Sequence, residues 1–160
     1  MKDKVSRINN EFYKNFPEIY LKPSKVNKFL KKYTNEVEKE IKNKFLKLKL
    51  DKNFVIYANG GFGRKEIFPI SDIDISIVEK NKPKDFKNLE EFISFLWDQG
   101  YKVGHSVRTI SDIKKISKSD LKEYTSYLTR RPIISTNEMD KKINYALSTL
   151  WTKNNFYNAK

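Results

Sequence analysis

The chain has 160 residues, of which 33 are Lys or Arg and 20 are Asp or Glu, giving a formal net charge of +13. This length suits one compact domain. The absence of cysteine excludes a disulfide framework, a Cys-ligated zinc site and a cysteine nucleophile, and the single histidine excludes any site built from several histidines.

Composition also bears on location and partners. The first 20 residues hold no apolar signal core, and no stretch approaches the ~18 apolar residues of a membrane span. We therefore expect a cytoplasmic protein with no membrane partner. The 28 lysines are dispersed from Lys2 to Lys160, whereas nucleic-acid readers cluster their charge on one face. We favour a solvated basic surface, with a basic nucleic-acid-binding domain kept as an alternative.

The first 50 residues read as an amino-terminal helical segment, set apart from a main domain over residues 51–160. A weak apolar pattern from Val5 to Phe16 precedes a strong one, and Ser24 after Pro23 is a candidate N-cap for the second helix. The strong pattern spaces its apolar residues by three and four, which predicts one stripe of a long helix. Its members are Val26, Phe29, Leu30, Tyr33, Val37, Ile41, Phe45 and Leu48.

From position 51 the pattern changes to strands and shorter helices. Residues 54–58 form a short apolar run closed by glycines, and residues 73–78 alternate between isoleucine and polar side chains, so both predict strands. We expect a helix over 86–97 ending at Gly100, a strand over 101–110, helices capped by Ser111 and Ser119, a strand over 132–135 and a helix over 138–150. This order predicts an α+β fold in which helices cover a small mixed sheet.

Two carboxylates carry the first chemical signal. Asp72 and Asp74 stand two apart on a predicted strand, so both side chains point to the same face. Ionised carboxylates in that arrangement repel each other, and a hard cation such as Mg²⁺ relieves the repulsion. For an isolated Asp-x-Asp the better explanation is a solvated polar face.

The glycines before the acid pair strengthen the functional interpretation. Gly60, Gly61 and Gly63 follow a strand and precede Arg64, in the stretch NGGFGRKE. Glycines there let backbone N–H groups approach a polyphosphate, and an arginine can clamp a phosphate with two hydrogen bonds. The spacing excludes both the dinucleotide fingerprint and the Walker loop. A simple tight turn between strand and helix is the structural alternative.

Together these motifs resemble those of a known family. GGFGRKEIFPISDIDISI is similar to the amino-terminal domain of the bacterial PII-protein uridylyltransferase/uridylyl-removing enzymes, within the DNA polymerase β-type nucleotidyltransferase superfamily. A second match is Leu96-Trp97-Asp98 followed by VGHSVRT at positions 103–109, and a fainter one runs from Asp120 to Arg131. The resemblance covers about residues 50–160, so we assign residues 51–160 to a partial nucleotidyltransferase domain.

The resemblance implies transfer of UMP from UTP to a tyrosine of a PII nitrogen-signalling protein, with Mg²⁺ or Mn²⁺ as cofactor. It makes Asp72 and Asp74 the catalytic metal ligands. It assigns nucleotide binding to the glycine turn and to polar residues that follow it. We expect His105 and Arg108 to share one face of their strand and to line the same site. The nucleotide-binding residues are Gly60, Gly61, Gly63, Arg64, Ser71 and Arg108.

Some positions depart from the family pattern. Lys65 stands where the family has glycine, and Thr129 stands where it usually has glutamate, two residues before Arg131. The superfamily also uses a third carboxylate, but residues 101–110 contain no Asp or Glu. His105 and Glu66 are the candidate substitutes, although a histidine beside Gly104 on an apolar strand is more often a hydrogen-bonded packing residue. The alternative function is therefore a nucleotidyltransferase-fold module that binds a nucleotide or a protein without turnover.

Overall fold

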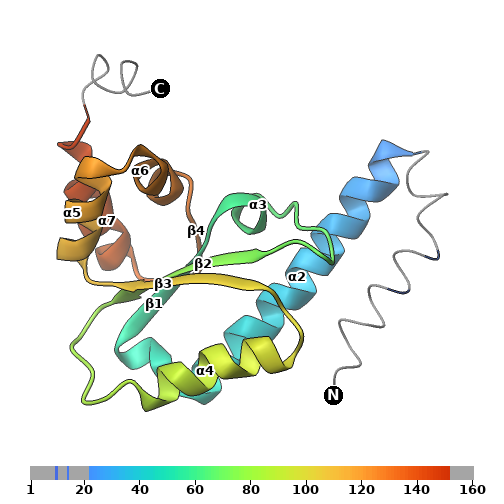
Figure 1. The fold of residues 1–160 in the computed structure, drawn as a ribbon, viewed down its shortest axis with the longest axis horizontal. Helices are drawn as coiled ribbons and strands as arrows, with labels where there is room; N and C mark the ends of the chain where they lie inside the picture. The colour runs from blue at the N-terminus through green and yellow to red at the C-terminus, as the bar shows by residue number, and fades with distance from the viewer. Residues whose placement is uncertain (1–9, 11–13, 15–21, 152–160) are drawn as a thin grey trace.

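The computed structural model describes residue 10, residue 14 and residues 22–151, and its strands form one central sheet with helices on both faces (Figure 1). The apolar residues of the weak helical pattern predicted from Val5 to Phe16 lie outside the described ranges. In chain order the elements are α2 (Pro23–Lys47), η1 (Leu50–Lys52), β1 (Phe54–Ala58), α3 (Gly60–Gly63), β2 (Ile73–Glu79), α4 (Lys87–Asp98), β3 (Val103–Arg108), α5 (Ile110–Ser119), α6 (Leu121–Leu128), β4 (Arg131–Ile134) and α7 (Asn137–Ser148).

The sheet has four strands in the order β3-β2-β1-β4. Strand β1 runs antiparallel to both β2 and β4, whereas β2 and β3 are parallel. The crossover between the two parallel strands is made by α4, as parallel neighbours require. The sequence-based prediction of an α+β fold with a small mixed sheet is thus confirmed.

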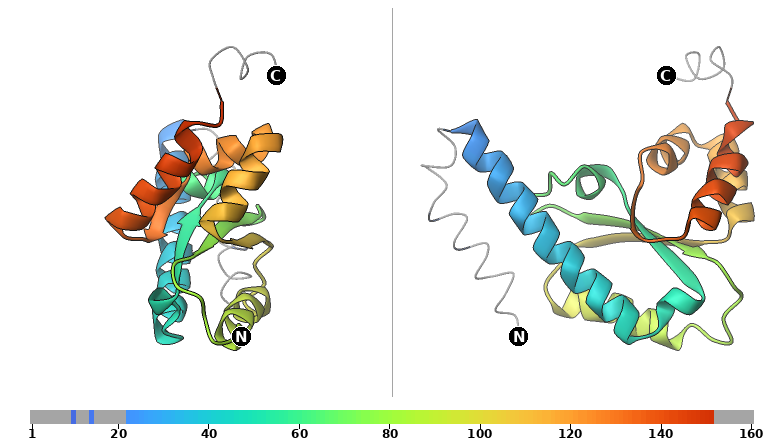
Figure 2. Two further views of the ribbon diagram at one scale, coloured as in Figure 1. Left: turned by 90° about the vertical axis from the view of Figure 1, so that its left-hand side faces the viewer. Right: turned by 180° about the vertical axis from the view of Figure 1, so that it is seen from behind.

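Alternation along the strands divides the core into two clusters, one on each face of the sheet. Ile73, Ile75 and Ile77 face the cluster shared with α2 and α4. Tyr57 and Val78 face the opposite cluster, shared with α5, α6 and α7. Figure 2 shows the same division from two further sides. Strand β1 is buried along its whole length because helices cover both of its faces.

Three predicted helix caps differ from the structure. The first long helix begins at Pro23 with Lys22 as its N-cap, not at Ser24, since proline is pre-organised for the first helical position. Helix α5 is capped by Thr109 in a reciprocal capping box with Asp112, not by Ser111. Helix α6 is capped by the Asp120 carboxylate, not by Ser119. The observed cap lies two residues before the predicted one at Lys22 and Thr109, and one residue after it at Asp120.

The element boundaries otherwise agree closely with the sequence pattern. The predicted strands over 101–110 and 132–135 become β3 and β4, and the predicted helix over 138–150 becomes α7. Gly100 follows α4 with a positive φ of 84°, as expected of a glycine that ends a helix. Among the described residues, no helix combines the length and the apolar character of a membrane span.

A buried polar network joins β1 to α7. The hydroxyl of Tyr57 lies 2.6 Å from Ser135 Oγ and donates to Asp140 Oδ1 at 2.7 Å. Tyr57 is fully buried, and burial is the main cause that raises its pKa to about 12. The Arg130 guanidinium lies 5.2 Å from the centre of its ring. The network therefore fixes α7 against the sheet on the face that also carries α6.

Candidate active site

A polar pocket of about 580 Å³ lies between the sheet and α6, where strands β1, β2 and β3 present their polar residues. Asp74 of the predicted acid pair lines it, together with the first glycine of the predicted turn. The lining residues are Asn59, Gly60, Asp74, Ile75, Ser76, Gly104, His105, Ser106, Lys122, Glu123, Thr125, Ser126 and Thr129.

The carboxylate of Asp74 lies between two glycines. A Cβ built on Gly60 would stand 3.2 Å from Asp74 Oδ2, and one built on Gly104 would stand 2.5 Å from Asp74 Oδ1. Gly104 is the direct neighbour of Asp74 in the parallel β2–β3 pair. Distances under 3.0 Å are essentially never seen for real Cβ atoms, so the present position of this carboxylate requires glycine at 104. Within the VGHSVRT motif, Gly104 therefore leaves the space that the Asp74 carboxylate fills.

The electrostatics of the pocket centre on the same carboxylate. The pKa of Asp74 is raised, first by partial burial and second by the negative charge of Asp72, while Lys122 acts in the opposite direction. Both aspartates are exposed, although only Asp74 lines the pocket. A carboxylate whose pKa is raised by a neighbouring negative charge also favours a divalent cation, which replaces the proton as the neutralising charge.

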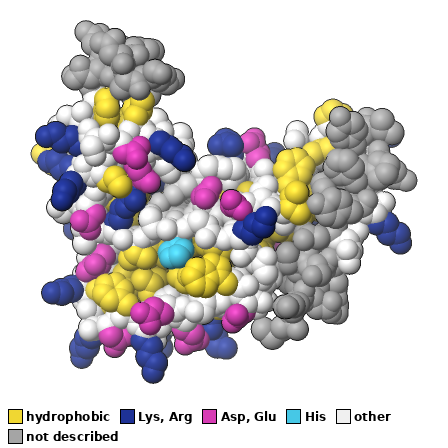
Figure 3. All heavy atoms as spheres, in the orientation of Figure 1, with side chains coloured by type: hydrophobic (Ala, Val, Ile, Leu, Met, Phe, Trp, Pro, Cys, Tyr) yellow, Lys and Arg dark blue, Asp and Glu magenta, His cyan; other side chains and the backbone are white. Residues whose placement is uncertain are grey.

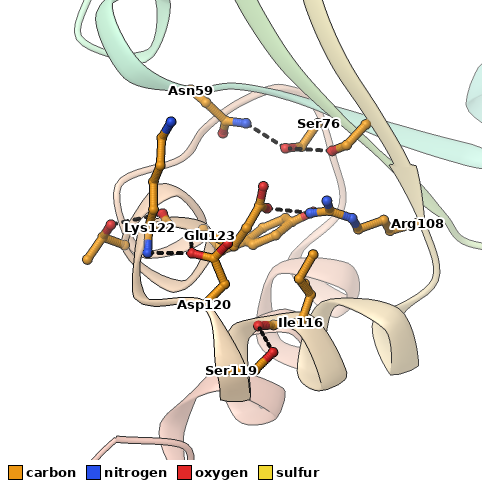
Figure 4. A network of polar contacts seen from close by, with 11 residues as sticks. Asn59, Ser76, Arg108, Ile116, Ser119, Asp120, Lys122 and Glu123 are labelled. Carbon is orange, nitrogen blue, oxygen red and sulfur yellow. Dashed lines mark hydrogen bonds and ion pairs between the residues drawn. The ribbon is translucent and has the colours of Figure 1, made fainter. Parts of the chain in front are cut away.

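A short chain of polar side chains forms the floor of the pocket (Figure 4). The Asn59 side-chain amide donates to Ser76 Oγ at 2.5 Å, and Ser106 donates to the same oxygen at 3.5 Å. The backbone N–H of Asn59 donates to the carbonyl of Asp74 at 2.9 Å. Asn59 therefore holds the end of β1 against the part of β2 that bears the acid. Its Oδ1 is buried and has no hydrogen-bond partner within the described part of the chain.

The glycine turn is held from its far side by Arg131 of β4. Gly60 has a positive φ of 52°, which suits glycine, and a Cβ on Gly63 would stand 2.9 Å from the Ala58 carbonyl. The Arg131 guanidinium donates to the carbonyls of Gly63 at 2.8 Å and Phe62 at 3.2 Å. The same guanidinium forms a 2.8 Å ion pair with Glu38 of α2. Gly63 is thus required for close packing, and the turn is joined to two other elements.

Arg108 does not extend freely into the pocket. Its Nη1 donates to Glu123 Oε2 and, at 3.2 Å, to the hydroxyl of Tyr127, both on α6 (Figure 4). The hydrogen bond to Glu123 is the largest cause of the raised pKa of Arg108. The pair connects β3 to α6 and so fixes the wall of the pocket that Glu123 lines.

His105 points to the other face of the sheet. It pairs with Ile75, whose side chain belongs to the α2–α4 cluster, and its ring lies 5.9 Å from the ring of Trp97 on α4. The expectation that His105 and Arg108 share a face is wrong, because residues three apart on a strand point to opposite sides. The structure therefore does not bring the imidazole beside Asp74.

Other residues predicted for the site lie outside the pocket lining. Arg64 is exposed and pairs with Glu66 at 2.9 Å, and Ser71 lies in the loop before β2. Gly61 would accept a Cβ at an ordinary contact distance of 3.7 Å. Lys65, where the family has glycine, adopts a positive φ of 62°, the left-handed conformation that glycine adopts without strain. Glycine would adopt the backbone conformation of position 65 without strain, which is consistent with the glycine that the family has there.

The sequence prediction did not include the wall that α6 contributes. Lys122, Glu123, Thr125, Ser126 and Thr129 all line the pocket. The available signal was the faint match from Asp120 to Arg131, which covers this helix but did not indicate that it faces the acid pair.

The donor set fits a divalent cation only if a ligand completes it. Within residues 22–151 and the two described residues before them, no group of three or more His, Asp or Glu side chains could hold a metal ion. The two carboxylates of Asp72 and Asp74 would supply only part of the oxygen coordination that Mg²⁺ takes, and substrate phosphates ordinarily provide the rest. Thr129, at the family's glutamate position, lines the pocket without a carboxylate. The residues therefore suit a cation that arrives with a phosphorylated ligand.

No family model matches the chain. Among curated proteins, it is 37% identical over 114 residues to the bifunctional uridylyltransferase/uridylyl-removing enzyme of Haemophilus influenzae (strain PittEE), over 66% of this chain. The enzymes of the same name from Acinetobacter baylyi and Vibrio vulnificus (strain YJ016) are each 37% identical, over 108 and 112 residues and 66% and 68% of this chain. The chain is a relative of the bifunctional uridylyltransferase/uridylyl-removing enzymes.

This uridylyltransferase relative spans 13% of the length of the Haemophilus influenzae and Vibrio vulnificus enzymes and 12% of the Acinetobacter baylyi enzyme. A solved structure, described as a crystal structure of the toxin-antitoxin with AMP-PNP, superposes with a TM-score of 0.45 at 18% identity. It covers 67% of this chain and 84% of that chain. This similarity is too low to assign a fold or a ligand to the chain.

Proposed function

We propose that this chain is a metal-dependent nucleotidyltransferase domain that transfers UMP from UTP to a tyrosine of a PII-type signalling protein. The observation that carries the proposal is the placement of Asp74, whose carboxylate lies between Gly60 of the glycine turn and Gly104 of β3. The relationship to uridylyltransferases supports the reaction class and the choice of nucleotide.

In this proposal Asp72 and Asp74 hold a Mg²⁺ or Mn²⁺ ion. A cation held there would neutralise phosphate charge. The acceptor tyrosine oxygen, which gives up its proton to solvent, would form the new bond to the α-phosphorus as the bond to pyrophosphate breaks. The glycine turn admits the phosphates close to the backbone, since Gly60 carries no Cβ between them and Asp74. Lys122, whose charge already acts on Asp74, supplies a positive charge on the opposite wall.

The direct test is incubation of the full chain with α-labelled UTP, Mn²⁺ or Mg²⁺ and a PII protein. We expect metal-dependent label on the PII protein, and its loss in Asp74→Asn. The matched control is Asp98→Asn, because Asp98 is an exposed aspartate at the end of α4. Absence of both label transfer and metal-dependent UTP binding would refute the proposal.

A specific observation favours a second candidate, a module that binds the metal–nucleotide complex without turnover. Among the described residues no third carboxylate joins Asp72 and Asp74 in a group that could hold a metal ion, and the nearby Glu123 is paired with Arg108. Thr129 occupies the position where the family usually has glutamate. Calorimetry that detects UTP–Mn²⁺ binding, together with absent label transfer, would support this candidate.

The variant Thr129→Glu separates the two candidates further. Thr129 is exposed and lines the pocket, so a longer acidic side chain fits there without disturbing the core. If the missing carboxylate limits the reaction, we expect transfer to rise by at least about 100-fold, the usual contribution of a positioned acid or base. Unchanged transfer in a folded Thr129→Glu variant would show that this position does not limit the reaction.

A further inference from the structure

A second hollow lies on the opposite side of β3 from the polar pocket, between the outer edge of that strand and α4. It has a volume of about 590 Å³ and an apolar floor. Three large side chains in it are exposed, Trp97 by 54%, Phe86 by 46% and Val107 by 39%. Figure 3 shows hydrophobic side chains gathered beside the single histidine, His105, which also lines this groove. We call it the α4–β3 groove.

The edge of the sheet beside this groove is open within the described residues. Strand β3 is the last strand in the order β3-β2-β1-β4, so only one of its edges is paired. The carbonyl of Lys102 accepts a hydrogen bond from the backbone N–H of Ile73. In a parallel pair alternate residues direct both backbone polar groups to the neighbouring strand, so the N–H and C=O groups of the even-numbered residues of β3 point toward β2. The backbone groups of Val103, His105 and Val107 therefore point away from the sheet, as an unpaired template for another strand.

The groove and the open edge are in register with each other. His105 and Val107 direct their side chains to the α4 face and also present the unpaired backbone groups. A strand added beside β3 would lie about 4.8 Å away and would place every second side chain on that same face. Those side chains would cover Trp97 and Phe86 and would extend the apolar layer that α4 already forms.

Charge around the groove identifies the kind of occupant. Glu79, Glu90 and Asp112 line it, and the one cationic lining residue, Arg108, is already paired with Glu123. The rim of the groove is therefore acidic, although the chain as a whole has a net charge of +13. It suits a basic partner and disfavours a second copy paired through β3, which would bring two acidic rims together.

We propose that the α4–β3 groove is a docking site for an extended, basic segment of a partner protein, which adds a strand to β3. The segment has alternating apolar residues that fill the groove and lysine or arginine residues at its ends that meet the acidic rim. This is recognition by strand addition, in which backbone hydrogen bonds provide affinity and alternate side chains provide specificity. The groove lies on the other face of the sheet from Asp74, and His105 borders both the groove and the pocket.

The test uses the full chain and three synthetic peptides, KKVTVTVKK, its acidic counterpart EEVTVTVEE and the proline variant KKVTPTVKK, which interrupts strand pairing. Binding is followed by NMR titration, and amide hydrogen exchange is measured with and without peptide. We expect KKVTVTVKK to bind at least about tenfold more tightly than either control, a difference of about 1.4 kcal/mol. It should slow exchange at the amides of Val103, His105 and Val107 selectively.

Variants place the binding on the groove. We expect Val107→Lys to weaken KKVTVTVKK at least about tenfold, whereas Tyr145→Lys, at a 78% exposed position on α7, should leave it unchanged. If circular dichroism shows that Val107→Lys is unfolded, Trp97→Ser takes its place with the same expectation. Equal binding of all three peptides, no binding, or protection of the β3 amides without peptide in a concentration-dependent dimer would overturn the proposal.

Discussion

The substitution Gly104→Ala tests the central geometry of the site. The new methyl group would lie 2.5 Å from Asp74 Oδ1, and the carboxylate would have to retreat by about 0.9 Å to reach the 3.4 Å of an ordinary contact. Asp74 is exposed, so it can rotate toward solvent without disturbing the core. Alanine is also a better strand residue than glycine by roughly 0.5–1 kcal/mol. We therefore expect the free energy of unfolding to change by no more than about 1 kcal/mol.

Ligand binding should respond far more strongly than stability. Displacing a metal ligand through its supporting neighbour typically costs 10–100-fold in affinity or activity, so we expect at least a tenfold loss of UTP–Mn²⁺ affinity by calorimetry. The control is Asp98→Asn, an exposed position at the end of α4 outside the pocket lining. Wild-type affinity in a folded Gly104→Ala protein would refute the role assigned to Asp74. Unfolding of the variant would instead show that Gly104 serves packing.

Three further substitutions test stability. Lys65→Gly removes a non-glycine residue from a positive φ of 62° and should raise the free energy of unfolding by about 1 kcal/mol in denaturant titrations; a decrease would contradict the strain argument. Asp74→Asn should melt at an equal or higher temperature at pH 7. The raised pKa of Asp74 means that the folded state favours the protonated carboxyl, so the ionised carboxylate lowers stability at pH values above its pKa in the unfolded chain. Below about pH 3 the carboxyl is protonated in both states, and the wild type and Asp74→Asn should melt at the same temperature. Tyr57→Phe removes one of the two donors to Asp140 Oδ1, the other being Ser135, and should cost about 0.5–1.5 kcal/mol, against almost nothing for the exposed Tyr145→Phe; equal effects would deny the network a role.

The sequence predicted those parts of the fold that depend on neighbours along the chain. The alternation in residues 73–78 gave β2, and the spacing from Val26 to Leu48 gave the buried stripe of α2. Caps were placed less well, because Thr109 and Asp120 compete with nearby serines and only the backbone decides which side chain meets the free N–H groups.

The site was predicted only in part, because its two walls come from distant segments. The acid pair and the glycine turn lie close in sequence, so their association could be inferred. The approach of α6 to Asp74 depends on how β4 and α7 return to the sheet, which no local pattern encodes. The sequence also gave no sign that Arg108 would be neutralised by Glu123.

The attachment of Arg131 has a consequence for any ligand of the glycine turn. Its guanidinium donates to the carbonyls of Phe62 and Gly63 and also forms an ion pair with Glu38. One side chain of β4 thus connects the glycine turn to α2. Backbone that is already immobilised loses little further freedom when a ligand arrives, and the entropic penalty of ordering it is met during folding. The rigidity of the glycine turn thus depends on Arg131, a residue that need not contact the nucleotide.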